Sequence, residues 1–129
     1  MAVQLNHTII ASYDPATAAG WFAEMFGIEA PIRYGPFWQV STSNDVNLDF
    51  DAVDPGFVIS PQHYAFLVSE EEFDGILGRI VERRIEFFAD PAGREAGRYN
   101  EHDGGRGLYF PDPSGHWLEI ITHPYGTGG

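Results

Sequence analysis

Cysteine is absent from the 129 residues, and basic residues are scarce. Without cysteine the chain has no disulfide framework and no thiolate metal site, so any metal would have to be held by histidine and carboxylate side chains. Only 7 Lys and Arg accompany 19 Asp and Glu, which gives a formal net charge of −12. Such a charge repels phosphate backbones and anionic lipid head groups, so nucleic acids and membranes are poor candidate partners.

Long apolar runs are also missing. No stretch approaches the roughly 18 to 20 apolar residues of a membrane-spanning helix. The first ten residues, MAVQLNHTII, lack the basic region and the apolar core of a secretion signal. We therefore expect a cytoplasmic protein, folded as a single domain over residues 1–129, because this length is typical of one domain with a real core.

The same order of strands and helices is predicted twice along the chain. The first half is predicted to contain a strand, a helix and three further strands, at about 5–12, 15–25, 30–34, 37–42 and 46–51. The second half is predicted to repeat this order at about 62–69, 70–84, 85–89, 106–110 and 116–122. Helix starts are marked by Asp14 before Pro15 and by a Ser69–Glu72 capping box. The sequence thus predicts two βαβββ modules, at about 4–53 and 60–124.

Polar residues at matching positions support the repeat. His7 and His63 lie in the first strand of each half, 56 positions apart, whereas Asp49 and Glu119 lie in the last strands, 70 positions apart. The 14 additional residues of the second half are accounted for by a Gly-rich polar loop at 91–105. This loop is either a solvated surface segment or a source of functional groups that cover a site.

Glu119 is the most informative single residue, because it stands between Leu118 and Ile120 in an apolar strand. Burying an unpaired carboxylate costs several kcal/mol, so Glu119 needs a cation. Strand alternation places His7, His63 and Glu119 each among apolar neighbours on one strand face. Two imidazoles and one or two carboxylates suit Zn, Fe, Mn, Co or Ni as divalent ions. The alternative for each histidine is a hydrogen-bonded core residue.

The chain resembles the vicinal oxygen chelate superfamily in three features. It has two βαβββ modules, a histidine in the first strand of each module, and a glutamate in the string RGLYFPDPSGHWLEI. This superfamily includes glyoxalase I, fosfomycin-resistance proteins, extradiol dioxygenases, methylmalonyl-CoA epimerase and bleomycin-resistance proteins. The resemblance covers about residues 4–123 and implies an α+β fold in which the modules form an open, mixed-sheet half-barrel around a divalent metal ion. It implies His7, His63 and Glu119 as metal ligands. Asp49 stands where glyoxalase-like members have a fourth ligand, or else belongs to a solvated strand face.

The resemblance also suggests roles around the metal. Glu119 would act as the base of a glyoxalase-like reaction. Tyr109 fits a tyrosine that assists the chemistry of extradiol dioxygenases, and it is equally a candidate core aromatic; the histidine expected before it is replaced by Asn100. The residues expected to contact the substrate are Trp117, Trp38, His102 and Arg106. His116 and His123, at the two ends of a strand, are expected at the surface.

These expectations favour a small metal-dependent enzyme of the lyase or isomerase type that chelates a vicinally oxygenated small molecule. A bound divalent ion would stabilise the negative charge that develops on such a substrate. One alternative is a metal-free antibiotic-binding protein of the bleomycin-resistance type, which the charge of −12 suits if the drug is cationic. A further alternative is an extradiol-type dioxygenase. The resemblance implies a homodimer in each case.

Overall fold

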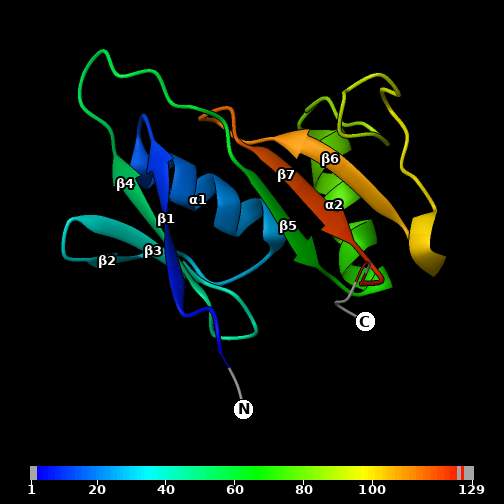
Figure 1. Ribbon diagram of the computed structural model, residues 1–129, viewed down its shortest axis with the longest axis horizontal. Coiled ribbons are helices and arrows are strands. Elements are labelled where there is room, and N and C mark those ends of the chain that lie inside the picture. The colour runs from blue at the N-terminus through cyan, green and yellow to red at the C-terminus, as the bar shows by residue number, and fades with distance from the viewer. Residues whose placement is uncertain (1–2, 125, 127–129) are drawn as a thin grey trace. The chain divides into compact units, whose positions relative to one another are not determined.

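The computed structural model describes residues 3–124 and 126, and these residues form two compact units, Met1–Ser60 and Pro61–Gly129 (Figure 1). Each unit combines one α-helix with one mixed sheet. The sequence prediction of an α+β fold built from two similar modules is therefore confirmed. No helix in the described part of the chain is long and apolar enough to cross a membrane.

The first unit is organised around a four-stranded sheet with the order β1-β4-β3-β2. Strands β1 and β4 are parallel, and the other neighbours are antiparallel. The elements of this unit are β1 His7–Ser12, α1 Pro15–Phe26, β2 Ile32–Tyr34, β3 Phe37–Ser41 and β4 Asn47–Ala52. Helix α1 begins as predicted: the Asp14 carboxylate accepts from the Thr17 backbone N–H at 3.2 Å, and Pro15 occupies the first turn.

The second unit repeats this arrangement with the sheet order β5-β7-β6. Its elements are β5 His63–Leu67, α2 Glu70–Glu82, a 3-10 turn η1 His102–Gly104, β6 Gly107–Pro111 and β7 Trp117–Ile121. Strands β5 and β7 are parallel, as β1 and β4 are, and in both units the long connection between the two parallel strands includes the helix. The predicted Ser69–Glu72 capping box is present at the start of α2.

The strand predicted at 85–89 was wrong. Only Phe88 pairs, by two backbone hydrogen bonds of 2.8 and 2.9 Å with Tyr109 and by a bridge to Ala96. Immediately afterwards the Asp90 carboxylate accepts backbone N–H groups of Arg94 and Glu95, which turns the chain away from the sheet. Pro91 could not donate to a ladder in any case. A single bridged residue, Phe88, thus stands beside β6 where β2 stands beside β3 in the first unit.

Each helix packs on one face of its own sheet (Figure 1). In the first unit Phe22 of α1 contacts Phe50 of β4, with ring centroids 6.0 Å apart. In the second unit the helix residues Phe73, Ile76 and Ile80 are buried together with alternate strand residues, namely Leu108, Phe110, Leu118 and Ile120. Strand alternation therefore directs the residues between them, including Glu119, to the opposite face.

Candidate metal and substrate site

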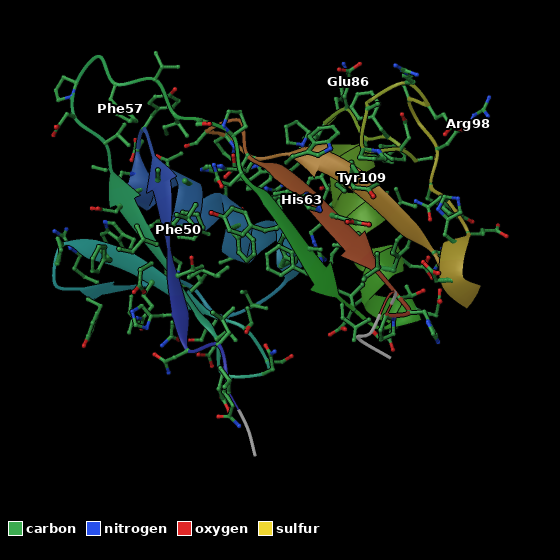
Figure 2. All side chains as sticks on the ribbon, in the orientation of Figure 1. Phe50, Phe57, His63, Glu86, Arg98 and Tyr109 are labelled. Atoms are coloured by element: carbon green, nitrogen blue, oxygen red, sulfur yellow. The ribbon has the colours of Figure 1, made fainter. Side chains whose placement is uncertain are left out.

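The strand register of the second unit brings four predicted site residues to one face of its sheet. His63 on β5 is paired with Trp117 on β7, and Tyr109 on β6 is paired with Glu119 on β7. Figure 2 shows His63 and Tyr109 on the two strands that flank β7. Because paired residues point to the same side of a sheet, this face carries an imidazole, a carboxylate, a phenol and an indole within one small area.

His63 and Glu119 are in direct contact. The Nε2 atom of His63 lies 3.1 Å from Oε1 of Glu119, and Nδ1 lies 2.9 Å from the backbone carbonyl oxygen of Trp117. Glu119 is only 4% exposed, whereas 44% of the His63 side chain is exposed. The carboxylate is therefore buried, as the sequence required, whereas the imidazole that contacts it is partly exposed to solvent.

The contacts of the His63 ring test whether a cation fits at this position. A carbonyl oxygen only accepts, so Nδ1 must carry the proton that it donates to Trp117, which leaves Nε2 with a lone pair facing a carboxylate. Two electron-rich atoms remain at this distance only if a proton or a metal ion lies between them. Two ligands bound at right angles to one ion at about 2.1 Å are roughly 3 Å apart. The His63–Glu119 distance therefore fits either a shared proton or a divalent metal ion bound by both groups.

Aromatic rings surround this pair. Tyr109 stacks on Trp117, with ring centroids 6.1 Å apart and an interplanar angle of 16°, and its centroid lies 5.9 Å from that of His63. The ring of Phe88 also lies near Trp117, with ring centroids 5.5 Å apart. Among the described residues, the indole Nε1 of Trp117 is the one buried side-chain polar atom that lacks a hydrogen-bond partner. These rings restrict the His63 imidazole and give the site an apolar wall.

A cavity of about 200 Å³ opens beside Glu119 and Tyr109. Its other lining residues include three from the inserted loop, and the complete set is Asn100, His102, Asp103, Arg106, Tyr109, Glu119, Ile121 and His123. The structure thus brings His102 and Arg106 into the same cavity as Glu119. Three residues of the inserted loop thus line the cavity beside Glu119. His123 also lines it, although its place at a strand end gave no signal for this.

Arg106 lines the cavity, but its guanidinium is bound to α2. It donates to the Glu70 and Asp74 carboxylates at 2.8 and 2.9 Å, and it lies over the rings of Phe73 and Tyr99 at 4.3 and 5.2 Å. Burial lowers the pKa of Arg106, but the hydrogen bonds to Asp74 and Glu70 outweigh it and hold that pKa above its ordinary value. Arg106 therefore anchors the inserted loop to α2.

Asn100 has a similar local role. Its amide donates to the Ala89 carbonyl at 2.8 Å, and its Oδ1 accepts from the His102 backbone N–H at 3.2 Å. Its backbone pairs with Gly107 at the start of β6. Asn100 thus fixes the turn that presents His102 to the cavity.

The first unit holds the remaining predicted residues. His7 is exposed at the start of β1, and its Nδ1 donates to the Asn6 Oδ1 at 2.7 Å, so Nε2 has a free lone pair. Asp49 is 4% exposed and accepts a hydrogen bond of 2.8 Å from the Gln39 amide. Trp38 is paired with Phe50, so it lies on the α1 side of the sheet, on the face opposite Asp49. Its ring is contacted by Arg33, at 5.6 Å.

Within residues 3–124 and 126, no three His, Asp or Glu side chains meet in an arrangement that could hold a metal ion. His63 and Glu119 form a pair in the second unit, and His7 belongs to the first. The expectation that His7, His63 and Glu119 share one ion stays a prediction.

His116 was expected at the surface, and this was wrong: it is 1% exposed. Its Nδ1 accepts from the Gln62 backbone N–H at 3.0 Å, and its ring makes an edge contact with Tyr64. The Asp112 carboxylate accepts backbone N–H groups of Ser114 and His116 in the turn before β7. Burial raises the pKa of Asp112. These residues build the turn that sets the register of β7.

Comparison with known proteins places this geometry in a family. No family model matches the chain. The solved structure of the oxidase ChaP-H2 is 52% identical, with a TM-score of 0.94 and complete coverage of both chains; that of the oxidase ChaP-H1 is 50% identical, with a TM-score of 0.93, and the match covers 97% of this chain and 99% of that one. The metallothiol transferase FosB of Lysinibacillus sphaericus is 25% identical, over 95% of this chain and 84% of its own length. The chain belongs to the vicinal oxygen chelate superfamily.

Membership confirms the resemblance seen in the sequence. The solved structure of a glyoxalase/dioxygenase from Nostoc punctiforme is 19% identical with a TM-score of 0.68. That of a glyoxylase/bleomycin resistance protein/dioxygenase domain from Frankia is 15% identical with a TM-score of 0.72, and both share the fold. This vicinal oxygen chelate protein therefore belongs to a superfamily of glyoxalase-like metalloenzymes. Its relatives carry the names of different reactions, oxidation and thiol transfer among them.

Proposed function

We propose that this vicinal oxygen chelate protein is a metal-dependent oxidase that acts on an oxygen-bearing small molecule. The observation that carries the proposal is the His63–Glu119 pair, in which two electron-rich atoms lie 3.1 Å apart beside a cavity. The reaction class is supported by the two relatives named oxidases, which match over almost the whole chain at 50 and 52% identity. The sequence alone favoured a lyase or isomerase, and these relatives shift the balance to oxidation.

In this proposal the metal is held by His7, His63 and Glu119. Two imidazoles and one carboxylate are the ligand set of many non-haem iron oxygenases, and three protein ligands leave positions open for other molecules. A divalent ion bound there would supply the Lewis-acid and redox chemistry that side chains lack.

The surrounding residues would prepare this site. The Trp117 carbonyl holds the His63 ring in the tautomer whose Nε2 is available as a ligand. The stacked ring of Tyr109 limits rotation of the imidazole. Tyr109 and His102 line the cavity and would contact the substrate, with a phenol and an imidazole able to donate or accept a proton. Arg106 would act indirectly, because its guanidinium is already bound by Glu70 and Asp74.

The test is metal analysis of protein purified without chelator, for wild type and three variants. His63→Ala and Glu119→Gln remove proposed ligands, and His102→Ala is the matched control, because it changes a cavity imidazole that is not a proposed ligand. We expect stoichiometric metal in wild type and His102→Ala, and loss of metal in the other two. Equal metal content in all four, or none in wild type, would contradict the proposal. The second result would favour the metal-free antibiotic-binding alternative.

A second measurement tests whether the metal keeps a position open to O₂, which an oxidase requires. Nitric oxide is an analogue of O₂ and gives a characteristic high-spin EPR signal when it binds a ferrous site with an open position. We expect this signal from anaerobic protein loaded with Fe²⁺, and its loss in Glu119→Gln. An Fe²⁺-loaded wild type that gives no signal would exclude the oxidase and leave a lyase or isomerase in which Glu119 serves as the base.

We also propose that the protein is a homodimer, as the resemblance implies. Each sheet exposes a large apolar side chain on one of its edge strands. Ile9 of β1 is 53% exposed, and Leu67 of β5 is 60% exposed. Burial of such side chains favours association. Sedimentation equilibrium at micromolar concentration should give twice the chain mass, and a monomer mass would rule the dimer out.

A further inference from the structure

The cavity beside Glu119 lies within the second unit, and it has room for about one substituted six-membered ring. All its lining residues fall between Asn100 and His123, and its volume is about 200 Å³. A cavity of roughly 150 Å³ is large enough to bind benzene. Glu119 is buried and His123 is exposed, so Glu119 marks the inner end of the cavity and His123 marks its mouth. A ligand in this space meets polar groups at both ends.

The polar groups of the lining are better supplied with acceptors than with donors. The Asn100 amide donates to a backbone carbonyl at 2.8 Å, and the Arg106 guanidinium donates to two carboxylates of α2 at 2.8 and 2.9 Å. In contrast, the ionised carboxylates of Asp103 and Glu119 can only accept hydrogen bonds. A ligand that fits this lining therefore has to bring a donor of its own.

The charge of the lining favours an uncharged ligand. Arg106 supplies the one guanidinium or ammonium group among the cavity residues that the structure describes, and its charge is offset by the carboxylates of Glu70 and Asp74. The Glu119 carboxylate is paired with His63, and Asp103 is exposed, so water and salt screen its charge. An anionic ligand would therefore find no free cation in the lining, and a cationic ligand would find only weak attraction.

The position of His123 is fixed by the backbone around it. The Thr122 N–H donates to the Arg106 carbonyl at 2.9 Å, and the Thr122 Oγ1 accepts the Arg106 N–H at 2.8 Å. Gly105 makes room for His123, because a Cβ there would lie 2.8 Å from the His123 Cβ. Nδ1 of His123 lies 2.8 Å from the Pro124 carbonyl oxygen, which can only accept, so Nδ1 carries the proton. In the uncharged ring Nε2 is then an acceptor, and no described residue donates to it.

We propose that His123 is a specificity-determining residue that accepts a hydrogen bond from a hydroxyl group of an uncharged ring bound in this cavity. The inference rests on the proposed function only in that this cavity is taken as the substrate site. The hydrogen bond would hold the hydroxyl group at the mouth and direct the opposite edge of the ring toward Glu119. A site that binds a hydroxyl group in this way discriminates against an analogue that lacks the donor.

The experiment measures the binding of fluorinated probes of similar size by fluorine NMR titration. para-Fluorophenol carries a hydroxyl donor, para-fluoroanisole carries the same oxygen without a donor, and para-fluorobenzoate is an anion. The protein is the full chain in EDTA, so that no probe binds through a metal ion. His123→Phe keeps a flat ring without an acceptor, and His123→Gln restores an acceptor.

A further pair of variants tests the effect of charge. Asp103→Asn removes a carboxylate from the lining, and Asn tolerates the φ of 55° at this position as Asp does. Glu71→Gln is the matched control, because Glu71 is exposed on α2 and does not line the cavity.

We expect wild type to bind para-fluorophenol about tenfold more tightly than para-fluoroanisole, which is the size of effect of one hydrogen bond. His123→Phe should lose most of this preference and His123→Gln should keep part of it, which a purely structural role of the ring would not produce. para-Fluorobenzoate should bind wild type most weakly. Asp103→Asn should strengthen its binding about threefold, whereas Glu71→Gln should not.

Two results would overturn the proposal while leaving the proposed function intact. The first is a preference for para-fluorophenol over para-fluoroanisole that is absent from wild type or unchanged in His123→Phe. The second is tighter binding of para-fluorobenzoate than of para-fluorophenol by wild type. If His123→Phe does not fold, His123→Leu provides the same comparison. Failure of the proposed function shows separately, as absence of metal from purified wild type, and the titrations in EDTA still decide the role of His123.

Discussion

The imidazole Nε2 of His63 lies 3.1 Å from the buried Oε1 of Glu119, while the other ring nitrogen is held by the Trp117 carbonyl. Two parallel strands, β5 and β7, fix this distance, because Glu119 pairs with Ala65 in register and His63 stands two residues earlier on the same face of β5. The contact thus depends on backbone pairing and not on a flexible loop. A position set in this way is suited to ligands that must be held in one geometry before the metal binds.

Glu119→Gln should leave the metal-free protein as stable as wild type or more stable, but it should make the protein less stable than wild type when metal is added. Gln has nearly the same shape as Glu but carries no charge. Without metal, the free energy of unfolding of the variant should therefore equal or exceed that of wild type. With Zn²⁺ at 100 times its dissociation constant, wild type should gain about 2.7 kcal/mol and the variant nothing. Denaturant unfolding in chelator and in Zn²⁺ measures both values. Exposed Glu71→Gln is the control. A large loss of stability in chelator would instead indicate a structural ion pair with protonated His63.

Arg106→Ala should destabilise the protein by about 1 to 2 kcal/mol and loosen the inserted loop. The guanidinium makes two ion pairs with exposed carboxylates of α2 and lies over two rings. Exposed ion pairs contribute little, and contacts that share one guanidinium do not add, so the total stays near the size of one or two such contacts of about 1 kcal/mol. Arg106→Lys should recover only part of this, because an ammonium cannot make both bonds in the same fork.

Chemical denaturation gives the stability change for Arg106→Ala, and amide exchange of residues 98–105 reports the loop. Arg98→Ala, in the same loop and directed outward in Figure 2, is the matched control. Equal exchange in the Arg106 and Arg98 variants would show that the contacts with α2 do not hold the loop.

The sequence predicted the parts of this structure that depend on local chemistry. Both helix starts were correct because Asp14–Pro15 and Ser69–Glu72 satisfy backbone donors within a few residues. The face of Glu119 followed from strand alternation. The strand at 85–89 failed because only one of its residues, Phe88, forms bridges before Asp90 turns the chain. His116 failed because its burial comes from the turn around Asp112 and from Tyr64, which is 52 residues away in sequence.

Site residues on the loop were the hardest to place. Nothing local in the sequence indicates that Arg106 would bind Glu70 and Asp74, since the ion pairs join segments about 30 residues apart. The side of Trp38 could have been found, because it shares strand parity with the apolar Val40, which is buried. Contacts between distant segments, and not propensity, determine these positions.

Gly105→Ala should disturb the cavity through a steric clash. A Cβ at this position would lie 2.6 Å from Oγ1 of Thr122 and 2.8 Å from Cβ of His123. Thr122 Oγ1 also accepts the Arg106 backbone N–H, so the clash falls on the end of β7 and on the start of β6. Overpacking of this kind costs about 1 to 3 kcal/mol.

Gly20→Ala is the matched control for Gly105→Ala. Its Cβ would meet nothing within 4 Å, and it lies inside α1, where Ala is preferred to Gly by about 0.5 to 1 kcal/mol. The control should therefore be more stable than wild type, while Gly105→Ala is less stable. Thermal unfolding measures both. Equal changes in the two variants would mean that the backbone near residue 105 can shift without cost.

Asp112→Asn should alter the pH dependence of stability, because burial raises the pKa of the Asp112 carboxyl above its ordinary value of about 4. A raised pKa means that the folded state binds the proton more tightly than the unfolded state. The resulting stability is complete below the unfolded pKa and is lost as the pH rises through the folded pKa. Asn cannot titrate, and its oxygen can still accept the N–H groups of Ser114 and His116. As the pH rises from about 4 to neutral, the free energy of unfolding of the variant should therefore increase relative to that of wild type.

Asp90→Asn should change the pH dependence of stability in the opposite direction. Hydrogen bonds from the backbone N–H groups, first that of Glu95, lower the pKa of the Asp90 carboxyl, which is exposed. Above the ordinary carboxyl pKa, wild type should therefore be more stable than this variant. This difference in stability should disappear as the pH falls through the lowered pKa. Denaturant unfolding of the three proteins between roughly pH 3 and 7 gives both slopes. If both variants change stability with the same slope, burial of Asp112 is not what sets its titration, and its hydrogen bonds to the turn before β7 dominate instead.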